Sequence, residues 1–151
     1  MAKGKTSRVE DSQLGNVGPH WRAHTESGWM NKETFEYYLM QLRQLCGDHE
    51  IYLLLDVHAS HRADECKELA STLNIQLIYI PPGFTDALQP CDLRVFGALK
   101  ATARSIWCRE QRWDPDRRRT KIDAVHDMIA AWNSLSEETI EDAWEIYTED
   151  T

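Results

Sequence analysis

Two aspartates stand where an α/β framework places reactive groups. Asp56 directly follows the apolar run 51–55, and Asp92 follows the next apolar run, 75–80, after the link 81–92. In open α/β sheets, ligands bind beyond the carboxyl ends of parallel strands. Two carboxylates converging there repel unless a divalent cation lies between them, and such hard oxygen ligands suit Mg²⁺ or Mn²⁺. The pair therefore predicts a metal site that activates water or a hydroxyl for phosphoryl transfer.

Two histidines offer a different metal chemistry beside the first aspartate. Asp56, His58 and His61 form a D-x-H-x-x-H pattern, in which imidazole nitrogens would bind zinc, manganese or iron. This pattern suggests a metal-dependent phosphohydrolase as one hypothesis for function. The simpler alternative is that Asp56 caps the following loop and His58 packs under the turn.

Hydrophobic spacing predicts the elements that position these residues. Apolar residues at steps of three and four predict a helix over 31–46, between an Asn cap and a Gly stop. The run 51–55 is typical of a strand covered on both faces. A helix capped by Ser60 follows, and 75–80 predicts a second strand that ends at Pro-Pro-Gly. Strand, helix and strand in this order form a βαβ unit with a parallel pair.

The second half of the chain predicts helices. Helical spacing runs from Asp92 to Trp107, and the polar stretch 112–119, which contains a proline, predicts an exposed turn. Apolar residues then predict two more helices, over 122–132 and 140–147. The C-terminal part is therefore expected to be helical throughout.

Composition indicates one soluble, globular domain. The chain has 151 residues, a net charge of -8 and 42% hydrophobic residues, enough for a core. Its apolar runs fall far short of the roughly 20 residues of a membrane helix, and its polar start has no signal-peptide core. The four cysteines form no C-x-x-C pair, so we expect free thiols in a reducing, intracellular compartment.

Charge is distributed unevenly along the sequence. Residues 94–121 carry nine basic and three acidic side chains, whereas residues 122–151 carry nine acidic side chains and no Lys or Arg. Concentrated basic side chains contact phosphates and release counterions on binding nucleic acid. The alternative is a solvated basic helix face that pairs with the acidic tail. The charge pattern alone leaves both open.

Several motifs in order resemble the DDE superfamily endonuclease domain, most closely that of pogo-like and jerky-like transposases and the host proteins derived from them. The motifs are SGWM (27–30), LLLDVHASH (53–61), PPGFT (81–85) and LQPCDLRVFGALK (88–100). The 35 residues between Asp56 and Asp92 also agree with that family.

The resemblance implies a ribonuclease H-like fold in which three carboxylates hold two Mg²⁺ (or Mn²⁺) ions for DNA strand cleavage and transfer. Asp56 matches the second carboxylate, Asp92 the third, and His61 is a motif residue near the active site. The first carboxylate should follow an upstream strand, and Asp11, in a polar stretch, does not fit it. We therefore expect an incomplete fold, an N-terminally truncated catalytic set and no activity from the isolated chain.

The resemblance also implies an organisation and partners. We expect an irregular segment at 1–26, a partial catalytic core at 27–110, and a basic turn with a helical extension at 111–151. DNA is the expected partner, contacted by Arg94, Lys100 and Arg104, with homodimers as a further arrangement, no small-molecule cofactor and no membrane. A eukaryotic member would be nuclear. The competing hypothesis is a non-catalytic DNA-binding or protein-interaction module that descends from a transposase.

Overall fold

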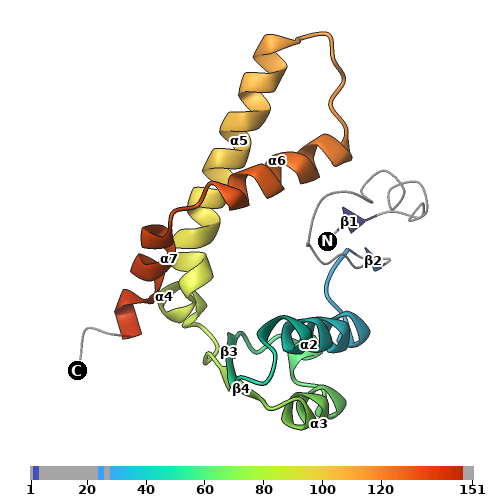
Figure 1. The fold of residues 1–151 in the computed structure, drawn as a ribbon, viewed down its shortest axis with the longest axis vertical. Helices are drawn as coiled ribbons and strands as arrows, with labels where there is room; N and C mark the ends of the chain where they lie inside the picture. The colour runs from blue at the N-terminus through green and yellow to red at the C-terminus, as the bar shows by residue number, and fades with distance from the viewer. Residues whose placement is uncertain (1, 4–23, 26–27, 148–151) are drawn as a thin grey trace. The chain divides into compact units, whose positions relative to one another are not determined.

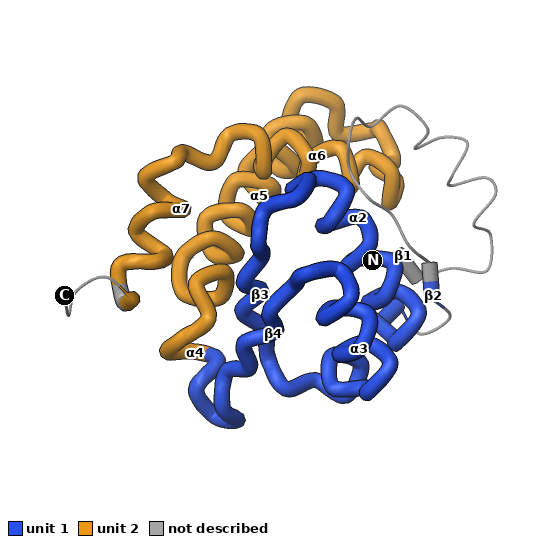
Figure 2. Tube along the Cα trace, turned by 60° about the horizontal axis from the view of Figure 1, so that its bottom comes forward, with its two compact units in different colours: residues 1–9, 18–85 blue, residues 10–17, 86–151 orange. Residues whose placement is uncertain are grey.

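The computed structural model describes residues 2–3, 24–25 and 28–147 of the chain. The chain divides into two compact units (Figure 2). The first unit holds the described residues up to Thr85, and the second holds those from Asp86 onward. Each unit has a hydrophobic core of its own.

A parallel βαβ unit lies at the centre of the first unit, as the sequence predicts (Figure 1). Strand β3 (Ile51–Leu55) pairs in parallel with β4 (Ile75–Tyr79), with Ile51 opposite Ile75 and Leu55 opposite Tyr79. Helix α3 (Asp64–Thr72) connects the two strands. The α/β class is thereby confirmed as a two-stranded parallel pair with helices.

Helix α2 (Lys32–Cys46) precedes β3 and has the predicted ends. Asn31 Oδ1 accepts a hydrogen bond from the Thr34 backbone N–H at 2.9 Å, and Thr34 Oγ1 accepts one from the Asn31 N–H at 2.9 Å. This reciprocal capping box satisfies two donors at the helix start. Gly47 follows the last turn at φ +59°, a conformation that costs glycine little.

Helices α2 and α3 cover one face of the strand pair (Figure 1). The buried core consists of Phe35, Leu39, Leu55, Cys66, Ala70 and Ile75. Burial raises the pKa of the Cys66 thiol, so this thiol stays protonated inside the core.

No described helix of the first unit covers the opposite face of the strand pair, so the expectation of strands covered on both faces is not met within this unit. Tyr52 and Ile78 point to this face and are 63% and 45% exposed. Side chains alternate between the faces of a sheet, and both helices of this unit pack on the other face. A continuous apolar run in the sequence therefore does not indicate here that both faces of the strand are buried.

Helix α3 begins later than the sequence predicts. Ser60, the expected cap, is buried within the 3-10 turn η1 (Ala59–His61), and α3 begins at Asp64. The Ser60 hydroxyl bonds His58 Nδ1 at 2.8 Å instead of capping a helix. The Ser60 hydroxyl is thus engaged by His58.

Arg43 joins the C-terminal ends of two helices in the first unit. Its Nε donates to the Leu73 carbonyl at 2.7 Å and its Nη2 to the Asn74 carbonyl at 2.8 Å. Its Nη1 donates to the carbonyls of Gly47 and, at 2.7 Å, His49. One guanidinium therefore satisfies carbonyls beyond the C-termini of both α2 and α3.

We expect Arg43→Lys to destabilise the first unit by about 2 kcal/mol. A lysine ammonium cannot reproduce the planar fork, and hydrogen bonds from charged donors contribute roughly 1.5–3 kcal/mol. Urea unfolding followed by circular dichroism measures the loss. Arg62→Lys is the matched control, because Arg62 is exposed and should change stability by less than about 0.5 kcal/mol. Equal effects of the two substitutions would contradict the role of Arg43.

The second unit consists of helical segments, as the sequence predicts. In chain order they are α4 (Thr85–Leu88), the π-helical turn η2 (Cys91–Val95), α5 (Phe96–Trp113), α6 (Lys121–Asn133), α7 (Glu137–Trp144) and the 3-10 turn η3 (Glu145–Tyr147). No helix in the described parts of the chain is long and apolar enough to cross a membrane.

Helix α5 is longer than the sequence predicts. It continues past Trp107 to Trp113 and ends where Asp114 leaves the helical region at φ -132°. The residue before a proline disfavours helical backbone, so Pro115 sets this end. Arg112 therefore lies on the helix and not in the turn.

Small residues let α5 and α6 approach closely in the core of the second unit. Leu99 and Ala103 of α5 pack against Ala131 of α6, with Ile106 and Leu135 at the margin.

Two short strands are described near the N-terminus. Strand β1 (Ala2–Lys3) pairs in parallel with β2 (His24–Thr25). The remainder of the irregular segment expected over 1–26, including Asp11, lies outside the described residues.

Candidate active site

Asp56 is held at the carboxyl end of β3 by its own turn. Its Oδ1 accepts a hydrogen bond from the His58 N–H at 3.2 Å and lies 2.8 Å from His61 Nδ1. No group among the described residues engages its Oδ2, and the side chain is 41% exposed. The carboxylate is therefore oriented on one side and open on the other.

The turn that carries His61 is fixed from neighbouring elements. The His61 ring packs 4.6 Å from the ring of Phe35 on α2. The Tyr79 hydroxyl, at the end of β4, donates to the His61 carbonyl at 2.7 Å. Burial raises the pKa of Tyr79, which keeps this hydroxyl protonated as a donor. The imidazole thus meets Asp56 in one orientation.

The two histidines take different partners. His58 Nδ1 bonds the Ser60 hydroxyl, whereas His61 Nδ1 faces Asp56. The described residues contain no group of three His, Cys, Asp or Glu side chains that could hold a metal ion. The phosphohydrolase hypothesis stays a prediction, and loss of phosphoester turnover in His58→Ala would be its signature.

Asp92 lies in the second unit, in the π-helical turn that leads into α5. Its backbone N–H donates to the Gln89 carbonyl at 3.0 Å, and its side chain is exposed with no hydrogen bond or ion pair to any described residue. Single π-helical turns occur frequently at functional sites. Asp56 and Asp92 belong to different units, so their expected convergence stays a prediction.

The loop before Asp92 contains an unsatisfied polar atom. Gln89 Oε1 is buried and has no hydrogen-bond partner among the described residues, and Pro90 beside it is buried. Burial, and secondarily the Asp92 carboxylate, raise the pKa of the Cys91 thiol. The Tyr147 hydroxyl anchors the loop by donating to the Leu88 carbonyl. Simple turn geometry does not account for the buried Gln89 amide.

The chain matches the family model of the DDE superfamily endonuclease over residues 2–144. It belongs to that family. The match confirms the resemblance seen in the sequence motifs and makes the chain a transposase-like nuclease domain, from a family that acts on DNA and typically uses divalent metal ions. No solved structure matches the chain.

The donor chemistry of this DDE domain fits a divalent metal. Asp56 Oδ2 and the Asp92 carboxylate are hard oxygen donors of the kind that Mg²⁺ prefers, and no described residue engages them. His61 holds the other oxygen of Asp56 and so orients the free one.

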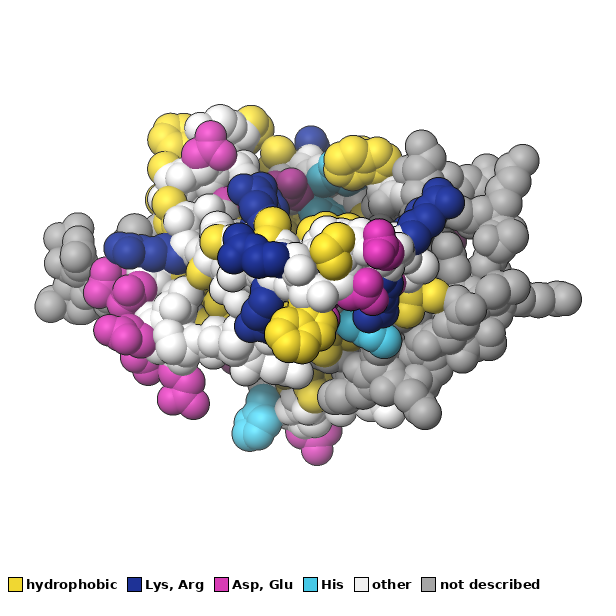
Figure 3. Space-filling view, turned by 90° about the horizontal axis from the view of Figure 1, so that it is seen from above, with side chains coloured by type: hydrophobic (Ala, Val, Ile, Leu, Met, Phe, Trp, Pro, Cys, Tyr) yellow, Lys and Arg dark blue, Asp and Glu magenta, His cyan; other side chains and the backbone are white. Residues whose placement is uncertain are grey.

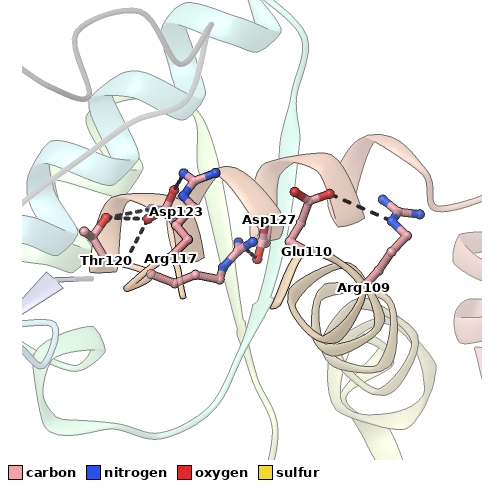
Figure 4. A network of polar contacts seen from close by, with 7 residues as sticks. Arg109, Glu110, Arg117, Thr120, Asp123 and Asp127 are labelled. Atoms are coloured by element: carbon pink, nitrogen blue, oxygen red, sulfur yellow. Dashed lines mark hydrogen bonds and ion pairs between the residues drawn. The ribbon is translucent and has the colours of Figure 1, made fainter. Parts of the chain in front are cut away.

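Several basic side chains of the DDE domain are neutralised within the second unit (Figure 4). Arg117 and Arg119 each lie 2.5 Å from a carboxylate, on Asp123 and Asp127 of α6. Looser pairs at 3.9 Å join Arg94 to Asp142 and Arg109 to Glu110. The expected pairing of basic side chains with the acidic segment 122–151 therefore holds for Arg94, Arg117 and Arg119, whereas Arg109 pairs with its neighbour on α5.

Arg119 is a structural residue at the centre of this network. Its side chain is only 4% exposed and lies 4.4 Å over the ring of Trp107. Its Nε is buried without a hydrogen-bond partner in the described structure, so Asp127 supplies its compensating charge. Arg119 is therefore not available to bind a ligand.

Other basic side chains face outward. Lys100, Arg104 and Arg112 on α5 are exposed, and no carboxylate in the described residues pairs with them. Figure 3, viewed from the end where α5 and α6 are joined, shows Lys and Arg side chains gathered together and acidic side chains grouped at the left, over α7. Lys100 and Arg104, two of the predicted DNA contacts, thus have no carboxylate partner among the described residues, whereas Arg94 pairs loosely with Asp142.

Proposed function

We propose that this chain supplies part of the ribonuclease H-like catalytic core of a DDE transposase, with Asp56 and Asp92 as metal ligands. The observation that carries the proposal is the Asp56 carboxylate at the end of β3, which His61 orients while Oδ2 stays open. The family match supports the same assignment. The substrate is DNA and the reaction is strand cleavage and transfer.

Each proposed site residue has a distinct task. Mg²⁺ or Mn²⁺, when bound, would stabilise the charge that develops on the phosphodiester in phosphoryl transfer. Asp56 offers Oδ2 as a ligand, and His61 keeps that carboxylate from rotating. Asp92 offers its exposed carboxylate from the π-helical turn η2, which leads into α5. Gln89, whose buried Oε1 has no hydrogen-bond partner among the described residues, lies in the loop that presents Asp92.

Iron-directed scission of the polypeptide tests the ligand assignment without requiring catalysis. Fe²⁺ occupies sites built from oxygen ligands, and with ascorbate and peroxide it generates radicals that cut the nearby backbone. We expect cuts near residues 56 and 92, located by mass spectrometry and suppressed by excess Mg²⁺. Because the two carboxylates are proposed to hold the same ion, Asp56→Asn and Asp92→Asn should each weaken the cuts at both positions.

The matched control for the scission experiment is Asp64→Asn. Asp64 is an exposed aspartate of the first unit that already pairs with Lys67 at 2.8 Å. Its substitution should leave both cuts unchanged. Cuts at other positions, or cuts that persist undiminished in Asp56→Asn and Asp92→Asn, would contradict the ligand assignment.

A second candidate function is DNA binding without cleavage. The exposed Lys100 and Arg104, which pair with no carboxylate of the described residues, favour it. In that case Lys100 and Arg104 contact phosphates, with a smaller contribution from Arg94 because of Asp142. This alternative predicts salt-dependent DNA binding together with the absence of iron scission near residues 56 and 92.

A further inference from the structure

One exposed face of α5 carries positive charge and small side chains but no carboxylate. The face, here named the α5 stripe, consists of Lys100, Ala101, Arg104, Ser105, Cys108 and Arg112, all exposed. Leu99 and Ala103 on the opposite side of the helix are buried. The helix contains one acidic residue, Glu110, which lies off the stripe and pairs with Arg109.

The cations of the stripe have no compensating carboxylate among the described residues, in contrast to four other arginines of the second unit. Arg94, Arg109, Arg117 and Arg119 each lie within 3.9 Å of a carboxylate. Lys100, Arg104 and Arg112 contact no carboxylate of the described chain, and Lys100 Nζ lies 5.8 Å over the Phe96 ring. In a chain of net charge -8, such a carboxylate-free face is suited to an anionic partner.

The dimensions of the stripe suit a phosphate backbone. With a rise of 1.5 Å per residue, Lys100 and Arg104 are about 6 Å apart along the helix axis, and Lys100 and Arg112 about 18 Å. This length corresponds to roughly half a turn of a DNA duplex, whose turn is about 34–36 Å. The short side chains of Ala101, Ser105 and Cys108 allow the sugar-phosphate chain to approach the helix closely.

We propose that the α5 stripe lies along the backbone of duplex DNA, with Lys100, Arg104 and Arg112 each neutralising a phosphate and Cys108 covered by the contact. The proposal rests on DNA as the partner in the proposed function, and it adds Arg112 and Cys108 to the contact. Because the contacts go to phosphates, they position the duplex without reading its sequence.

Salt-dependent binding of the full chain tests the stripe. The probe is a fluorescein-labelled duplex of 20 base pairs, followed by anisotropy between 50 and 200 mM NaCl. Each phosphate contact contributes about 0.9 to the slope of log affinity against log salt. Lys100→Gln, Arg104→Gln and Arg112→Gln should therefore each lower the slope by about 0.9 and weaken binding roughly 10-fold at 50 mM NaCl.

Arg109→Gln and Lys67→Gln are the matched charge controls, since both side chains already pair with a carboxylate and neither belongs to the stripe. They should lower affinity less than the stripe variants do. Glutamine is a good helix former and these positions are exposed, so the circular dichroism spectrum should not change.

Alkylation of Cys108 gives a second, independent readout. Bound duplex should slow the reaction of Cys108 with iodoacetamide about 10-fold, as measured by peptide mass spectrometry. The reaction of Cys46 on α2 should not change, and the triple variant of Lys100, Arg104 and Arg112 should lose the protection of Cys108.

Three results would overturn the assignment of the stripe. The first is wild-type affinity in the triple variant, and the second is undiminished alkylation of Cys108 in the DNA complex. The third is loss of self-association in the triple variant, measured by sedimentation, while DNA binding stays unchanged. In that case the partner of the stripe would be the acidic segment 122–151 of a second copy. None of these results affects iron scission at Asp56 and Asp92, so the proposed function can stand or fall separately.

Discussion

Replacing Asp127 with asparagine is expected to destabilise the second unit by about 3–5 kcal/mol. The substitution removes the charge that compensates Arg119, whose side chain is 4% exposed and whose Nε already lacks a partner in the described structure. An uncompensated buried guanidinium costs far more than an exposed ion pair gains. Amide hydrogen exchange of α5 and α6 should accelerate about 100-fold or more, while exchange of α2 stays unchanged.

Two further variants separate the buried charge from general damage to the unit. Arg117→Gln disrupts an ion pair in which Arg117 is 53% exposed, and it should cost less than about 1 kcal/mol. The double variant Arg119→Met/Asp127→Leu removes both buried charges together and should recover most of the lost stability. A small effect of Asp127→Asn, or no recovery in the double variant, would contradict this account.

The parts of the fold that the sequence predicts best are those with strong local signals. Apolar spacing between Asn31 and Gly47 locates α2 to the residue, because the cap and the stop satisfy local backbone groups. The run 51–55 and its partner strand are also located by local sequence signals. The exposure of Tyr52 was not predictable, because the burial of a strand residue depends on which other elements pack against the strand.

The site shows the same division between local and tertiary information. The position of Asp56 at a strand end follows from the sequence, but its 2.8 Å contact with His61 depends on Phe35 and Tyr79, which reach the turn from other elements. Arg119 and Arg104 are equivalent in a charge count, yet one is buried on Trp107 and the other is exposed. Only the packing of α6 against α5 separates the structural arginine from the available one.

We expect residues 1–151 alone to show no metal-dependent cleavage of DNA. The sequence offers Asp56 and Asp92 but no aspartate that matches the first carboxylate of the family. Mg²⁺ retains its waters unless several charged oxygens replace them, so an incomplete ligand set binds it weakly. A misplacement of about 1 Å at a reacting centre can already lower the rate about 100-fold, and the loss of a ligand displaces an ion further.

Incubation of the purified chain with supercoiled plasmid and either Mg²⁺ or Mn²⁺ measures this activity directly. Nicking that persists in Asp56→Asn and Asp92→Asn would come from a contaminant, and would leave the prediction intact. Nicking that requires metal and disappears in both variants would show the prediction to be wrong. A carboxylate outside the proposed set, such as Asp11, Asp86 or one from a second copy, would then complete the ligands, and Asp11→Asn and Asp86→Asn would identify which one.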